Sequence, residues 1–309
     1  IMWLVGSVAR ALKLTDSANA FALMLKLPSI LADILAAYVV YRLAKKNSSR
    51  TIALTLLAVV AFNPVMMFIS AGWGQIDQIL TVLLALSLWL FTEKKTVWAG
   101  VVYGAAILIK PQALMVGPLF ALAYILYIKD GSWKKRLLET VLAVLAALAV
   151  IIALSIPFTS TQKWDWLLDK YFSTATSYPF ASIEAFNWFA LIGGNWKSVN
   201  AVPFLFSYKT WGMLFMGISI LYSGFLYIRG YKKNAKGALM LSTAFLLAAI
   251  FTFGHYMHER YLFPVLLLII IAFILYKDTR LFVSFSAFSV SLLINAMAAF
   301  MIAEIQSAR

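Results

Sequence analysis

Long apolar runs alternate with short polar stretches along the whole chain, and this pattern predicts a bundle of membrane-embedded helices. Most runs approach the roughly 20 residues that a helix needs to cross a hydrocarbon core. Two short neighbouring runs are joined only by Lys110-Pro111, which predicts a tight hairpin. We expect an all-α, polytopic transmembrane bundle of about ten segments: 24–44, 50–70, 76–92, 97–109, 112–128, 137–158, 209–228, 237–254, 261–276 and 281–303.

Residues 1–23 differ from these runs, because Arg10, Lys13 and Asp16 interrupt the apolar sequence. The uninterrupted stretch is too short for a full crossing, so we expect an amphipathic helix that lies on the membrane surface. Within the second predicted segment, Asn63-Pro64 predicts a kink or a helix end.

Composition agrees with a membrane protein. The 309 residues are 63% hydrophobic and 12% charged, whereas soluble domains are about half apolar and a quarter charged. The net charge of +14 does not predict nucleic-acid binding, since the cations form short clusters between apolar runs rather than one patch. The chain has no cysteine, which excludes disulfides, thiolate metal sites and a catalytic thiol.

Lys and Arg concentrate in alternate loops, and such a bias sets the orientation of a membrane protein. We assign the basic loops to the cytoplasmic side; they contain Arg42, Lys45, Lys46, Arg50, Lys94, Lys95, Lys129, Lys134, Lys135, Arg136, Arg229, Lys232, Lys233, Lys236, Lys277 and Arg280. The opposite side, predicted to be the outer face, holds an aromatic-rich loop over 159–208. Loops of this length are uncommon unless they are functional, so we expect this one to roof a cavity at the membrane surface.

Asp77 lies at the outer mouth of a predicted helix, directly after Trp73-Gly74-Gln75. One interpretation is capping of the free N–H groups at the helix start. The other, which we favour, is contact with a sugar or a phosphate-linked substrate. Trp73 offers a flat apolar face for a pyranose ring, and Gln75 with Asp77 supplies a hydrogen-bond donor and acceptor.

His255, His258, Glu259 and Arg260 lie close together near the end of another outer loop. In helical geometry His255 would share a face with both His258 and Glu259. The order H-x-x-H-E is not the H-E-x-x-H of zinc proteases, so we expect no metal. A plain solvated turn is one alternative, and recognition of a leaving phosphate by two imidazoles and a guanidinium is the one that we favour.

Two further polar positions have a structural and a functional interpretation. Lys110 is either a lysine that extends its ammonium group to the lipid headgroups or a fixed cation for a lipid phosphate, with Gln112 beside it. Asp33 falls in the middle of a segment, where a carboxylate is costly, and we favour a packing role inside the bundle over substrate binding.

Five motifs in this order resemble those of GT-C glycosyltransferases. The late H-x-x-H-E-R motif is similar to that of the dolichyl-phosphate-glucose glucosyltransferases of N-glycan assembly. Over about residues 20–275 the chain most resembles prokaryotic relatives of GPI-anchor mannosyltransferases. The motifs are Lys26–Leu35, Asn63-Pro64 through Gly72–Asp77, Leu108–Gln112, Tyr178-Pro179-Phe180 to Phe186-Asn187-Trp188, and His255–Arg260.

The resemblance implies an inverting membrane enzyme that moves a hexose, mannose or glucose, from a polyprenyl-phosphate donor to a glycan or glycolipid acceptor, with no further cofactor. It implies an integral protein of the bacterial plasma membrane whose active face is extracytoplasmic. Phosphate would be bound by Lys110, His255, His258 and Arg260. Sugar or acceptor would be bound by Trp73, Gln75, Asp77, Gln112, Tyr178, Trp188 and Glu259.

The chain departs from the family at its start. The chain begins with Ile1, and the family's catalytic aspartate lies in a loop that would precede it. We therefore expect residues 1–23 to be the remnant of that loop and 24–309 to be the transferase-like domain. No residue is nominated as the catalytic base, and the chain alone is expected to be inactive. A secondary transporter or lipid flippase stays the main alternative, and a membrane metalloprotease ranks below it for lack of ligands.

Overall fold

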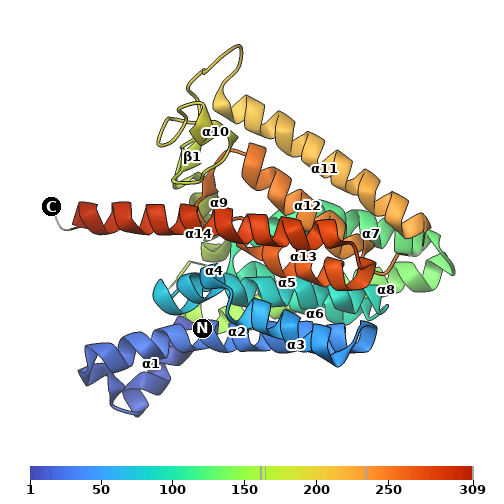
Figure 1. The fold of residues 1–309 in the computed structure, drawn as a ribbon, viewed down its shortest axis with the longest axis horizontal. Coiled ribbons are helices and arrows are strands. Elements are labelled where there is room, and N and C mark those ends of the chain that lie inside the picture. Colours follow the sequence, from blue (N-terminus) through green and yellow to red (C-terminus); the bar gives the residue numbers. More distant parts are fainter. Residues whose placement is uncertain (161, 164, 234, 308–309) are drawn as a thin grey trace.

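A computed structural model describes residues 1–160, 162–163, 165–233 and 235–307, which fold into a helical bundle (Figure 1). Most helices follow the long axis of the molecule, and one short pair of parallel strands lies at one end. The elements are α1 Met2–Ala11, η1 Leu14–Asp16, α2 Ala18–Asn47, α3 Arg50–Ala61, α4 Pro64–Met67, the π-helical turn η2 Phe68–Gly72, α5 Asp77–Thr92, α6 Thr96–Ile109, η3 Pro111–Val116, α7 Gly117–Lys129, α8 Trp133–Ser155, η4 Ile156–Phe158, α9 Trp166–Thr176, β1 Ser182–Ile183, α10 Trp188–Leu191, α11 Tyr208–Lys232, α12 Ala238–Phe253, β2 Met257–His258, α13 Phe263–Tyr276 and α14 Thr279–Ser307.

Several helices begin where a side chain accepts a hydrogen bond from a free backbone N–H group. Ser17 caps α2, Ser49 caps α3 and Ser207 caps α11. Asn63 caps α4 and Pro64 is its first residue, so the chain breaks where Asn63-Pro64 predicted a kink.

Within the described residues, six helical stretches have the length and apolar composition to cross a membrane: 18–47, 50–72, 111–129, 133–158, 208–232 and 279–305. Four shorter apolar helices, α5, α6, α12 and α13, occupy the other predicted segments. The expected all-α polytopic fold is therefore confirmed, whereas ten full crossings are not supported.

Two predicted segments differ from the structure. Residues 1–23 do not form one helix, because α1 ends at Ala11, a 3-10 turn follows, and Ser17 caps α2 well before the predicted start at 24. The stretch 159–208 is not one loop, because within its described residues it contains α9, β1 and α10.

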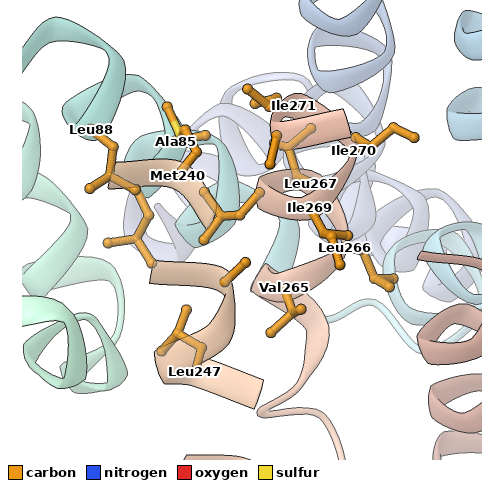
Figure 2. Close-up of a cluster of buried hydrophobic side chains, with 14 of the residues drawn as sticks. Ala85, Leu88, Met240, Leu247, Val265, Leu266, Leu267, Ile269, Ile270 and Ile271 are labelled. Carbon is orange, nitrogen blue, oxygen red and sulfur yellow. The ribbon is translucent and has the colours of Figure 1, made fainter. Parts of the chain in front are cut away.

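The centre of the core is α13, whose side chains are apolar on every side. A helix of this composition is stable only when it is buried all round. Its residues Val265, Leu267 and Ile270 are at most 1% exposed. They lie among side chains of α5 and α12, including Leu88 and Met240 (Figure 2).

The helices α6 and α8 pack with their backbones in contact. A Cβ atom added to Gly100 would lie 2.2 Å from the carbonyl oxygen of Ala143, and one added to Gly104 would lie 2.6 Å from that of Ala147. This small-xxx-small pattern on both helices is the typical close contact of membrane helices.

Candidate functional site

The first part of the site is the turn that leads into α5. The π-helical turn η2 closes with a bond from Trp73 N–H to the Phe68 carbonyl, 2.7 Å long. Gly74 then takes a φ of +79°, which an L side chain rarely adopts, and the Gln75 N–H donates to the Ile69 carbonyl. This geometry delivers Asp77 as the first residue of α5.

Asp77 joins three segments that are far apart in the sequence. Its Oδ1 accepts a hydrogen bond of 2.6 Å from Lys110 Nζ, in the α6–η3 turn. Its Oδ2 lies 3.6 Å from Arg260 Nε, in the turn before α13. The cap position belongs to Ile76, and no side-chain cap bond forms there, so the capping interpretation of Asp77 is wrong.

Both cations of this cluster also lie over aromatic rings. The Arg260 guanidinium is 4.5 Å from the Trp73 ring centroid, and the Lys110 ammonium is 5.1 Å from that of Tyr261. Such contacts hold a cation in place while leaving its N–H groups partly available.

Gln112 stabilises the same part of the site, next to Tyr261. Its Nε2 donates 2.9 Å to the Tyr261 carbonyl, and its side chain is buried. Burial, and secondarily the charge of Asp77, raise the pKa of Tyr261 to about 12. The tyrosine therefore stays neutral beside Lys110.

The carboxylates of the cluster lie beneath its cations. The side chains of Asp77 and Glu259 are 1% and 9% exposed, whereas those of Lys110, His258 and Arg260 are 16% to 20% exposed. Because the positive groups are nearer the surface, the arrangement can present N–H donors to an anion while the carboxylates hold them in position.

Glu259 completes this lower layer. Its carboxylate lies 3.3 Å from Arg260 Nη1 and 3.8 Å from His258 Nδ1. Burial alone would raise the pKa of Glu259, but the neighbouring His258 and Arg260 lower it below its usual value. Glu259 is therefore ionised at neutral pH.

His258 belongs to a strand rather than to a helix, which corrects the helical expectation for this motif. Residues 257–258 form β2, paired in parallel with Ser182 and Ile183 of β1. Tyr256 has a φ of +61°, which turns the chain into this strand. The Tyr178 ring packs edge-on against His258 at 5.2 Å, so the 159–208 segment borders the cluster directly.

Asn295 of α14 fixes this segment. Its Oδ1 accepts from Phe186 N–H at 2.9 Å, and its Nδ2 donates to the Glu184 carbonyl. Asn295 is not among the residues predicted from the sequence, although a polar residue in an apolar membrane helix is a signal for such a role. Glu184 also accepts from Trp196 Nε1.

His255 does not join the cluster. It is 6% exposed, and its imidazole lies so close to Gly212 of α11 that an added Cβ would approach Nδ1 to 2.3 Å. Burial, with a smaller contribution from the cation of Lys209, lowers the pKa of His255 to about 4. The expected pairing of His255 with His258 or Glu259 on one helical face is wrong.

Trp188 also lies apart from the cluster. It begins α10 and, with Phe186, Asn187 and Phe253, lines a separate cavity of about 710 Å³. No hydrogen bond, ion pair or ring contact among the described residues joins Trp188 to Asp77 or to its partners.

Several buried polar atoms of α2 and α5 have no hydrogen-bond partner among the described residues. Among them are the Ser29 hydroxyl and the Gln78 amide. Asp33 lies beside Ser70, which agrees with its expected position inside the bundle. The described residues contain no group of three or more His, Asp or Glu arranged to hold a metal ion.

Comparison with known protein families gives a match over the first part of the chain. No curated protein matches the chain. The family model described as dolichyl-phosphate-mannose-protein mannosyltransferase matches residues 8–160, which include Trp73, Asp77 and Lys110 and end before Tyr178. With its several apolar helices, the protein is an integral, multi-pass membrane protein. The match over residues 8–160, just under half of the chain, supports a membrane glycosyltransferase of the GT-C superfamily.

Proposed function

We propose that the protein transfers a hexose from a polyprenyl-phosphate donor to a glycan or lipid acceptor on the outer face of the membrane. The family description supports a lipid-phosphate sugar as the donor class. Such a donor requires a membrane enzyme, because its hydrocarbon chain stays in the bilayer.

The observation that carries the proposal is the two-layer cluster around Asp77. Lys110, His258 and Arg260 lie on the exposed side, and Asp77 and Glu259 hold them from below. When the sugar leaves the donor, negative charge develops on the lipid phosphate. Cations that are already oriented stabilise that charge without reorganising during the reaction.

The cluster supports phosphate binding better than proton abstraction. Asp77 and Glu259 are both buried and ion-paired, so neither is placed to take a proton from an acceptor hydroxyl. In our proposal they are positioning residues, and the base of an inverting transfer is assigned to neither.

The aromatic side chains divide into two roles. One face of Trp73 lies against Arg260, so its role here is to hold that cation. Tyr178 is 51% exposed beside His258, and we assign it, with Gln75, to the sugar. Gln112 is committed to the Tyr261 carbonyl and acts as a positioning residue.

The two histidines provide a matched test. The natural protein that contains these residues is placed in nanodiscs with radiolabelled polyprenyl-phosphate mannose or glucose and host membrane acceptors. His258→Ala is expected to lower transfer by about 100-fold, the usual loss when one donor to a developing oxyanion is removed. His255→Ala, at equal amounts of folded protein, is expected to retain transfer.

Equal loss in both variants would contradict the proposed role of His258. Solute movement across proteoliposomes without sugar transfer from either donor would instead favour a transporter.

A further inference from the structure

A second cavity lies away from the Asp77 cluster, in the half of the bundle where α2 and α5 end. It has a volume of about 490 Å³, within the range of roughly 300–1,000 Å³ that is usual for small-molecule sites. Trp89, which lines it, is about 18 Å along the helix axis from Asp77, at 1.5 Å per residue. The cavity is therefore not part of the proposed transfer site.

Most of its wall is apolar and membrane-facing. On the rim, Leu35 and Val39 of α2 and Leu86 of α5 are 39% to 48% exposed. The floor is the bundle core, where Met240 and Leu267 are at most 1% exposed (Figure 2). The cavity is thus a groove open at the side of the helices, a shape that suits a hydrocarbon chain.

One end of the groove is cationic. On α2 the apolar positions are followed by Arg42 and Lys46, which line the same cavity in the last two turns of the helix. Both side chains are exposed, and neither forms an ion pair with a carboxylate among the described residues. Arg42 Nη1 donates 2.7 Å to the Tyr38 hydroxyl, which holds the guanidinium at the groove rather than away from it.

Aromatic side chains lie at the same end of the groove as the two cations. Tyr38 and Trp89 flank the cationic end from α2 and α5. Tyr and Trp are enriched where a membrane protein meets the lipid headgroups, because their rings are apolar and their polar atoms reach water. Apolar wall, aromatic belt and cations thus follow one another in the order of a phospholipid's tail, glycerol and phosphate.

We propose that this groove binds an anionic phospholipid from the leaflet opposite the Asp77 cluster. The acyl chain lies along Leu35, Val39 and Leu86, and the phosphate contacts Arg42 and Lys46. Basic pockets between membrane helices recognise anionic lipid headgroups in this way. The site is separate from the Asp77 cluster, because no hydrogen bond, ion pair or cation–π contact among the described residues joins the two.

Native mass spectrometry of the purified chain in detergent tests the proposal, with dioleoyl phosphatidylglycerol and dioleoyl phosphatidylcholine as probes. Wild type is expected to retain phosphatidylglycerol more tightly. Each Lys or Arg near an anionic lipid contributes roughly fivefold in affinity, so R42A/K46A, which removes two cations, is expected to weaken phosphatidylglycerol binding by roughly 10- to 30-fold. Both side chains are exposed, so their removal leaves no buried group unpaired.

The matched control is K45A/R50A, which removes one Lys and one Arg from the same end of the bundle but outside the groove. It is expected to bind phosphatidylglycerol like wild type. A third variant, Leu86→Trp, fills the groove and is expected to lower retention of both lipids. Equal binding of the two lipids by wild type, or an equal loss in the control, would overturn the proposal.

Discussion

At the scale of single residues, the two histidines of one motif lie in different surroundings and have different roles. His258 lies at the surface of the cluster, 3.8 Å from Glu259, while His255 is buried against Gly212. Nothing in the spacing of the two histidines distinguishes them, because the difference arises from Tyr256, whose positive φ turns the chain between them.

The buried histidine makes stability depend on pH. The pKa of His255 is about 4 in the folded protein, against about 6.5 for an ordinary histidine. The unfolded chain therefore binds the extra proton first, so stability is present at neutral pH and is lost as the pH falls from about 6.5 towards 4. Between pH 7 and pH 5 we expect a loss of about 2 kcal/mol from this group.

Thermal unfolding in detergent at pH 7 and pH 5 measures this effect. His255→Asn, which cannot titrate, is expected to show a smaller decrease in melting temperature than wild type. A His258→Asn variant, which removes the other histidine, serves as the control. If His255→Asn and wild type lose the same stability between the two pH values, the buried histidine is not the cause.

Individual polar residues of the site could be predicted, but their partners could not. Asp77, Lys110 and Arg260 stand out because charged residues beside apolar helices are costly without a role. Their pairing links positions 33 and 183 residues apart, and no local pattern encodes such a contact. For the same reason Tyr261 and Asn295, which support the site from the turn before α13 and from α14, were not predicted.

At the scale of elements, hydrophobic periodicity located helices better than it located their ends. The predicted segments 76–92 and 237–254 agree closely with α5 and α12. The start of α2 was misplaced, since its first turns are set by the Ser17 cap and Pro28 is accommodated inside the helix. Apolar content reports which stretch of a helix is kept from water, by lipid or by the protein core, whereas a cap decides where the helix begins.

The contact between α6 and α8 gives a prediction at this scale. Gly100→Ala places a Cβ 2.2 Å from the Ala143 carbonyl, so the helices must separate, and overpacking of this kind costs about 1–3 kcal/mol. Gly217→Ala in α11 is the matched control, because no atom lies within 4 Å of its added Cβ. It is expected to be neutral or stabilising by up to about 1 kcal/mol.

Melting temperatures of the two purified variants in the same detergent compare these costs. Gly100→Ala should melt clearly below wild type, and Gly217→Ala at or above it. A Gly100→Ala variant as stable as the control would mean that α6 and α8 are not held in backbone contact.

At the scale of the whole molecule, the fold brings its separated motifs to one end of the bundle. The turn before α5, the α6–η3 turn and the segment before α13 meet at Asp77, and β1 with β2 adds the 159–208 segment. The sequence predicted that these motifs share a face, because the Lys and Arg bias alternates between loops. It could not predict the pairing of β1 with β2, because each strand has only two residues, too few for a recognisable strand pattern.

That shared face is the basis of the proposed orientation, and the absence of cysteine allows a direct test. A single introduced cysteine is the only thiol in the chain. Lys197→Cys lies in the 159–208 segment and Lys134→Cys in the first turn of α8, at the basic side of the bundle, and both side chains are exposed. If the basic loops are cytoplasmic, a membrane-impermeant maleimide should label Lys197→Cys in intact cells and label Lys134→Cys only after permeabilisation. The reverse pattern would place the Asp77 cluster on the cytoplasmic side, where a sugar on a nucleotide rather than on a lipid phosphate would be the available donor, and the proposed function would fail with the orientation.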